Sequence, residues 1–191
     1  MFGIGESDTN ALTLLKEDHR RVEELFKQYE SQKEEGSGAE KTKTAQLICV
    51  ALTVHATIEE EIFYPAVRRA LDEDGKEVVD EAAVEHQSLK DIIERLESAP
   101  PKDPLYDAAV KVLEEYVKHH VKEEEGELFS KLRFSDLDLE ELGKQLFARK
   151  AQLLEPSRTA STRARGGESR GRQSSRTSGR GSQRTTARES R

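Results

Sequence analysis

The residues best suited to chemistry in this sequence are its histidines, because four of the five stand where they could bind a metal. His55 is followed four residues later by Glu59, and His120 is followed four residues later by Glu124. In an α-helix, a spacing of four places two side chains on the same face. An imidazole beside a carboxylate on one face can act as a pair of metal ligands. The two H-x-x-x-E pairs therefore make metal binding the first chemistry to consider.

The other two histidines of this set, His19 and His86, also interrupt the apolar stripe of a helical pattern. A single histidine on an apolar face is more often a satisfied core residue than a ligand. Four inward histidines on four separate helices, with two inward glutamates, are much harder to explain in that way. A buried carboxylate is costly without a counter-charge or a metal. We therefore predict one metal site, formed by His19, His55, Glu59, His86, His120 and Glu124.

The number and type of these ligands indicate two metal ions. Six ligands exceed the four of a structural zinc site, and Glu59 and Glu124 can bridge two ions while the histidines bind as terminal ligands. Imidazole and carboxylate without thiolate suit iron, manganese or zinc better than copper(I) or an iron–sulfur cluster. Such a set leaves coordination positions for water, oxide, dioxygen, peroxide or nitric oxide. The residues alone do not separate a di-iron centre from other two-metal sites.

The fourth helix offers an alternative pair of ligands, because His119 and Glu123 have the same spacing as His120 and Glu124. We favour the latter pair because it is in phase with the apolar residues of its helix, which are Leu113, Val117 and Leu128. His119 is then expected near the site or on the surface. The remaining acids of these motifs are expected on a solvated face, and they are Glu60, Glu61 and Glu125. No tyrosine is predicted to take part, and Cys49 is expected to be a small core residue.

The elements that must position these ligands are helices, since the apolar residues recur at spacings of three and four and no strand alternation is found. The first helix is expected after a cap at residues 7–9, and Pro65 is expected to bend the second or loosen one of its turns. A closing stretch at 72–75 is expected to end that second helix. The predicted fold is all-α, an up-down-up-down four-helix bundle with a short extra helix and a disordered tail. The helices are expected at about 10–35, 48–71, 79–96 and 109–133, with the short one at 137–154.

An internal repeat supports this arrangement. Residues 18–22 align with residues 85–89, and residues 55–64 align with residues 120–129. The first alignment pairs the two lone histidines, and the second pairs the two H-x-x-x-E motifs. The bundle is therefore expected to consist of two similar helical hairpins, each of which supplies one half of the ligands.

The order of these motifs over about residues 8–133 resembles the hemerythrin family, specifically its bacterial HHE cation-binding branch. The resemblance implies a four-helix bundle with a non-haem di-iron centre, bridged by carboxylate and oxide, whose iron ligands are the six residues predicted above. Two departures stand out. Oxygen-carrying hemerythrins have a second histidine one turn from the one matching His86, where this chain has Ala82 and Lys90. This argues against reversible oxygen carriage. The proline that often follows Leu-Phe in the fourth helix is Ser130, a change expected to be structural only.

Charge divides the chain into two parts. Residues 156–191 contain ten Arg and two Glu, a net charge of +8, and the overall −7 leaves −15 for residues 1–155. We expect a bundle domain at 1–155 and a disordered Arg/Ser/Gly-rich tail at 156–191. The tail could bind nucleic acid through phosphates, but it has no aromatic residues for base stacking. With one cysteine, no apolar span and no signal-like start, we expect a cytoplasmic protein without membrane segments.

Two classes of function follow. In the first, the di-iron protein binds, senses or detoxifies dioxygen, peroxide or nitric oxide, or serves iron homeostasis. A weak catalase- or oxidase-like activity would arise at the open metal positions, with manganese or zinc as less favoured metals. In the second, the metal only stabilises a regulatory or interaction module, and the Arg-rich tail binds nucleic acid.

Overall fold

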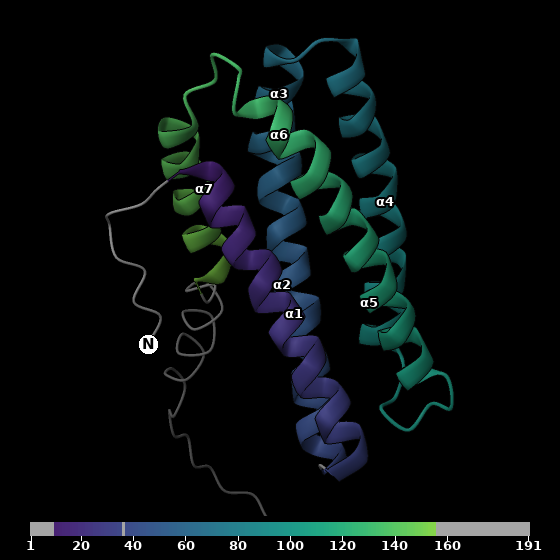
Figure 1. Ribbon diagram of the computed structural model, residues 1–191. Helices are drawn as coiled ribbons and strands as arrows, with labels where there is room; N and C mark the ends of the chain where they lie inside the picture. Colours follow the sequence, from purple (N-terminus) through teal and green to yellow (C-terminus); the bar gives the residue numbers. More distant parts are fainter. Residues whose placement is uncertain (1–9, 36, 156–191) are drawn as a thin grey trace, which may run out of the picture. The chain divides into compact units, whose positions relative to one another are not determined.

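Two antiparallel helical hairpins form the bundle, as predicted (Figure 1). The computed structural model describes residues 10–35 and 37–155, and no β-strand occurs within these ranges. The elements are α1 (Ala11–Glu35), α2 (Gly38–Ile58), η1 (Glu59–Phe63), α3 (Tyr64–Ala70), α4 (Glu73–Ser98), α5 (Tyr106–Glu123), η2 (Glu124–Leu128), α6 (Phe129–Leu132) and α7 (Leu139–Leu154). The first hairpin pairs α1 with an arm made of α2, η1 and α3. The second pairs α4 with an arm made of α5, η2 and α6.

Short polar side chains set the starts of α1 and α4. Asn10 Oδ1 accepts hydrogen bonds from the backbone N–H groups two and three residues later, at 3.0 and 3.4 Å. It thus caps α1, whereas residues 7–9, where the sequence predicts the cap, lie outside the described ranges. Asp72 accepts a hydrogen bond from the backbone N–H of Gly75 at 3.1 Å. The second arm ends at Ala70, directly before the stretch 72–75, as predicted. The same stretch also begins α4, which therefore starts at Glu73, earlier than the predicted position near residue 79.

Each arm that carries an H-x-x-x-E pair contains one π-helical turn, and the turn begins at the glutamate. These residues are Glu59 in η1 and Glu124 in η2. In both turns the backbone N–H of the residue five positions later donates to the glutamate carbonyl. Single π-helical turns inside α-helices frequently occur at functional sites. Pro65 follows η1 closely, in keeping with the predicted loosened turn, but Ser130 follows η2 at the matching position. The π turn therefore forms with or without the proline.

The apolar core consists of two clusters separated by the predicted ligands. One contains Leu15 and Phe63, and the other contains Val22 and Leu113. Along each of the four arms, the histidine lies between a residue of one cluster and a residue of the other. Burial of these apolar side chains stabilises the bundle on both sides of a polar layer. The apolar clusters therefore fix the helices on both sides of the polar layer, and the predicted ligands lie between the clusters.

The short C-terminal helix α7 packs against α1, α2 and η1 (Figure 1). Its Leu142 and Leu146 are buried in the same apolar cluster as Leu15. Its basic residues reach the first hairpin: Lys150 forms an ion pair with Asp18, and Arg149 Nε lies 2.6 Å from Oε2 of Glu61. The predicted amphipathic helix therefore belongs to the bundle core.

None of the helices in the described part of the chain combines the length and the apolar character that a membrane span requires. The predicted disorder and nucleic-acid binding of residues 156–191 fall outside the described ranges.

Candidate metal centre

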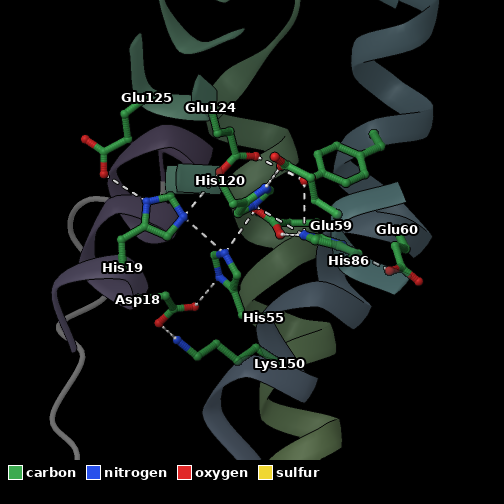
Figure 2. A network of polar contacts seen from close by, with 12 residues as sticks. Asp18, His19, His55, Glu59, Glu60, His86, His120, Glu124, Glu125 and Lys150 are labelled. Carbon is green, nitrogen blue, oxygen red and sulfur yellow. Dashed lines mark hydrogen bonds and ion pairs between the residues drawn. The ribbon is translucent and has the colours of Figure 1, made fainter. Parts of the chain in front are cut away.

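All six predicted ligands meet in the middle of the bundle, and all are buried (Figure 2). Their exposed fractions are 6% for His19, 5% for His55, 0% for Glu59, 1% for His86, 3% for His120 and 2% for Glu124. Each of the four long arms contributes one histidine, and the two π turns contribute the glutamates. The potential ligand atoms form two groups that share Glu59.

The first group combines two histidines with both glutamates. The Nε2 atoms of His19 and His55 lie 3.1 Å apart. Oε1 of Glu59 is 3.2 Å from Nε2 of His55, and Oε2 of Glu124 is 3.2 Å from Nε2 of His19. Four ligand atoms therefore converge on one point, as the ligands of a metal ion would.

The second group lies on the other side of Glu59. The Nε2 atoms of His86 and His120 lie 3.3 Å apart, and Oε2 of Glu59 is 3.4 Å from Nε2 of His86. The two oxygens of Glu59 thus face one histidine pair each. A carboxylate in this position can bridge two metal ions.

Tyr64 is a residue of this site that the sequence reasoning missed. Its hydroxyl oxygen lies 3.4 Å from Nε2 of His86 and 3.4 Å from Oε1 of Glu124, and the side chain is buried. The sequence does contain a signal, because Tyr64 is the residue immediately after the π turn that begins at Glu59. The hydroxyl is a further oxygen donor beside the second group.

Within residues 10–35 and 37–155, the carboxylate oxygens of the two buried glutamates mostly lack a hydrogen-bond donor, as expected of carboxylates that bind cations. Both carboxylate oxygens of Glu59 and Oε2 of Glu124 are buried without a hydrogen-bond donor in the described part of the chain. Leaving a buried carboxylate without a partner costs on the order of 1–3 kcal/mol or more. The four Nε2 atoms point toward the same space (Figure 2). Metal ions would satisfy both sets of atoms, so these residues fit the group that the sequence predicts.

A ring of four outer carboxylates faces the other ring nitrogen, Nδ1, of the histidines. Three of them form hydrogen bonds with it, and Asp18 lies 3.6 Å from Nδ1 of His55 without a hydrogen bond. Each carboxylate comes from one long arm and faces the histidine of the next arm, so that the ring closes around the bundle. Figure 2 labels three of the four, which are Asp18, Glu60 and Glu125. A carboxylate that accepts from Nδ1–H leaves Nε2 free to bind a metal. The Nδ1-to-oxygen distances are 3.6 Å for His55 with Asp18, 3.0 Å for His86 with Glu60, 2.9 Å for His120 with Glu85 and 2.8 Å for His19 with Glu125.

The prediction of a solvated face is wrong for two members of this ring. Glu60 and Glu125 are not on a solvated face: their side chains are 33% and 31% exposed and turn back to the histidines. Glu61, by contrast, lies on the surface beside Arg149. The internal repeat contains the missing signal, because a second acid follows both Glu59 and Glu124 directly.

The electrostatics of the metal-free centre differ between the two bridging candidates. Burial and the neighbouring charge of Glu124 raise the pKa of Glu59 well above its usual value. Burial also acts to raise the pKa of Glu124, but contact with His19 and the nearby imidazoles outweighs it and lowers that pKa to about 2. Burial together with His120 and His55 lowers the pKa of His86 to about 4. The centre therefore favours neutral imidazole at His86, the form that binds metals.

The alternative pair in the fourth helix lies outside the centre. The His119 side chain is 61% exposed and that of Glu123 is 34% exposed, and the two contact each other and Glu85. At the positions one turn from His86, Ala82 is part of an apolar cluster and Lys90 forms an ion pair with Glu60 at 2.6 Å. Neither residue supplies a ligand atom to the groups described above.

Comparisons with known proteins agree with this geometry. Residues 10–132 match the model of the hemerythrin HHE cation-binding domain. A crystal structure of an HHE cation-binding domain-containing protein from Mycobacterium kansasii superposes with a TM-score of 0.62 at 25% identity, covering 75% of this chain and 86% of that one. An uncharacterised protein of Mycobacterium tuberculosis is 30% identical over 107 residues, which are 54% of this chain and 63% of that protein.

A third relative carries the name of a nucleic-acid enzyme. A protein of Nostoc sp. called a DNA nickase is 30% identical over 132 residues, which are 69% of this chain but only 36% of that protein. The matched region thus spans between about a third and two thirds of the length of these curated relatives. The family match, however, covers most of this chain and the whole of the buried site. The chain belongs to the hemerythrin HHE cation-binding domain family.

Proposed function

We propose that this chain binds two metal ions, with iron the best fit, in a centre that binds or reacts with dioxygen, peroxide or nitric oxide. The observation that carries the proposal is the position of Glu59 between two histidine pairs, with one oxygen toward each. A set of imidazole, carboxylate and phenol donors without thiolate suits iron better than softer metals. When bound, iron supplies redox and electrophilic chemistry toward small oxygen and nitrogen ligands.

The space next to the histidines supports a small ligand. A cavity of about 20 Å³ is lined by all four histidines and by apolar residues of the core, among them Leu52, Leu89 and Val117. A volume of about 10–15 Å³ accommodates one water molecule. The cavity is therefore of the size of one small ligand such as a water or diatomic molecule, and far smaller than an organic substrate of ordinary size.

The protein residues around the centre have separate tasks in this proposal. Glu59, which is common to both groups of ligand atoms, would connect the two ions, and Glu124 would bind the ion of the first group. The outer carboxylates orient the imidazoles. The apolar clusters on both sides exclude bulk water from the centre. With Ala82 and Lys90 in place of a second histidine beside His86, the second ion has fewer protein ligands. This favours a reactive or sensing role over reversible oxygen carriage.

The test is metal analysis of protein purified without added metal, followed by anaerobic loading with Fe(II) and exposure to air or peroxide. We expect about two irons per chain, together with a change in visible absorption and consumption of peroxide. A single zinc per chain would overturn the two-metal proposal. Two irons without any spectral change or peroxide turnover would reject the reactive role and leave a metal-stabilised interaction module.

A second candidate function is an interaction with nucleic acid. Two observations favour it. The Nostoc relative is called a DNA nickase, and residues 156–191 contain ten arginines. The test is retention on DNA at increasing salt for the intact chain and for a variant with Arg170, Arg172, Arg176 and Arg180 changed to Gln. Retention that is lost at lower salt in the variant supports this function. Equal retention of the two proteins would reject it.

A further inference from the structure

A second set of potential metal ligands lies on the surface beside the buried centre. Glu85 in α4 meets His119 and Glu123 in α5: Nε2 of His119 is 3.1 Å from Oε1 of Glu123 and 3.4 Å from Oε1 of Glu85. Three ligand atoms from these residues lie within 4.8 Å of one another. His119 and Glu123 are the second H-x-x-x-E pair of the fourth helix. An imidazole between two carboxylates is a donor set that divalent cations accept.

The surface around these residues is concave and acidic. They line a groove of about 570 Å³, and the other residues of its wall are Glu77, Asp80, Glu81 and Val84. Asp80 is paired with Arg68, but no Lys or Arg is among the residues that line the groove in the described part of the chain. A concave surface of one charge sign raises the local concentration of the opposite ion. This groove therefore attracts cations.

Glu85 connects the surface residues to the buried centre. Its Oε1 atom faces His119, and its Oε2 atom lies 2.9 Å from Nδ1 of His120. A small cavity of about 10 Å³ is lined by Glu85, Glu123, His120 and Glu124, and by the apolar residues Val78, Ala82 and Leu128. Such a volume is about that of one water molecule. Glu85 and Glu123 line both the groove and this cavity. These two residues therefore connect the surface groove with the residues of the buried centre.

Each carboxylate of the outer ring forms one corner of it. Each of the three corners other than Glu85 lies beside a lysine ammonium group, which disfavours cation binding there. Lys90 lies 2.6 Å from Glu60, Lys16 lies 3.7 Å from Glu125, and Lys150 pairs with Asp18. The groove beside His19 is also lined by basic residues, which are Arg20, Lys118 and Lys122. A positive charge at these corners repels an approaching metal ion. Only at Glu85, among these four corners, is the partner on the outer side an imidazole, which can itself bind the ion.

We propose that Glu85, His119 and Glu123 form a loading site, at which a divalent cation binds before it passes to the buried centre. The proposal rests on the function proposed above, since a loading site needs a centre to load. The ion binds first between the three side chains in the acidic groove. It then moves along Glu85, whose second oxygen already contacts His120, into the small cavity beside Glu124.

The test is the rate at which the metal-free full-length protein takes up Co²⁺, followed by visible absorption after rapid mixing. The variant His119→Gln with Glu123→Gln removes two ligands on the surface. Its uptake rate should fall about tenfold or more, since focusing of ions changes such rates by about 10- to 1,000-fold. The final amount of bound Co²⁺ should equal that of the wild type. Glu115→Gln, on an exposed position of the same helix, is the matched control and should load at the wild-type rate.

The outcomes separate this proposal from the previous one. If the wild type takes up about two Co²⁺ and the variant loads equally fast, the loading site is rejected while the centre stands. If the variant loses bound metal at saturation, His119 and Glu123 are permanent ligands, and the loading role is also rejected. If the wild type itself binds no Co²⁺, the two-metal centre fails first. Slow uptake to full occupancy, with an unchanged melting temperature of the metal-free variant, supports the loading site.

Discussion

The hydroxyl oxygen of Tyr64 lies 3.4 Å from Nε2 of His86, beside the group of ligand atoms that has fewer protein donors. Burial, with Glu59 and Glu124 nearby, raises the pKa of this phenol well above its usual value in the metal-free protein. A bound cation reverses such a shift, because it stabilises the ionised form. We therefore expect the phenol of Tyr64 to be neutral in the metal-free protein and to ionise and bind metal once an ion occupies the centre.

Changing Tyr64 to Phe should weaken the binding of one of two iron ions by about tenfold, within the range seen when groups around a metal are removed. If the phenolate binds iron, the wild type will show a visible charge-transfer band that the variant lacks. Tyr29→Phe is the matched control, because Tyr29 is buried and donates to Asp107 at 2.6 Å, away from the centre. An unchanged spectrum and affinity in the Tyr64→Phe variant would show that Tyr64 is only a core residue.

Changing Glu59 to Gln should stabilise the metal-free protein at pH 7 by on the order of 1–3 kcal/mol, while abolishing two-metal binding. The pKa of Glu59 is raised in the folded protein, so ionisation costs stability as the pH rises above 4.5, the usual value of this group. At pH 4 the glutamate is largely protonated whether the chain is folded or not. The stabilisation should therefore nearly vanish in thermal melts at pH 4 with a chelator present.

Glu124→Gln is the contrasting variant for that experiment. The pKa of Glu124 is lowered to about 2, so its ionised form contributes stability above pH 4.5 that is lost as the pH falls toward 2. The substitution should therefore lower the melting temperature of the metal-free protein at pH 7. If both variants shift the melting temperature in the same direction, the two glutamates are not in different electrostatic states.

Changing Glu60 to Gln should lower the affinity of the centre for metal by about 10- to 100-fold, because Glu60 orients the imidazole of His86. The neighbouring change Glu61→Gln provides the control. Glu61 lies on the surface, with 46% of its side chain exposed, and forms an ion pair with Arg149 at 2.6 Å. Surface ion pairs of this kind contribute about 1 kcal/mol or less to stability. Competition with a chelator measures both affinities. Equal losses in the two variants would contradict an orienting role for Glu60.

Changing Leu146 to Ala should destabilise the bundle by about 2–5 kcal/mol, since the side chain is fully buried in the cluster that includes α1. Leu154 lies in the same helix but is 54% exposed, and its replacement by Ala should change stability by about 0.5 kcal/mol or less. Urea unfolding of the two variants makes the comparison. A small effect at Leu146 would mean that α7 is not needed for the core.

Much of the centre could be predicted from the sequence because helical periodicity is local. The positions of His55 and Glu59, one turn apart in an apolar stripe, are sufficient to place both on an inward face. The repeat then predicts the same for the second hairpin. The choice of His120 over His119 followed from helical phase and from the alignment of His120 with His55 in the repeat. In the structure His120 is buried, while 61% of the His119 side chain is exposed.

The remaining features depend on how the arms meet. The sequence alone determined the four helices, the inward histidines and glutamates, and the family. Each of these follows from the spacing of residues within one helix or from the internal repeat between the two hairpins. Only the tertiary structure decided that Glu59 stands between both histidine pairs, that Tyr64 joins them, and that Glu60 turns inward. These contacts join residues on different arms. The packing of the two hairpins and the extra residue of each π turn set their distances, and no single-helix periodicity contains that information.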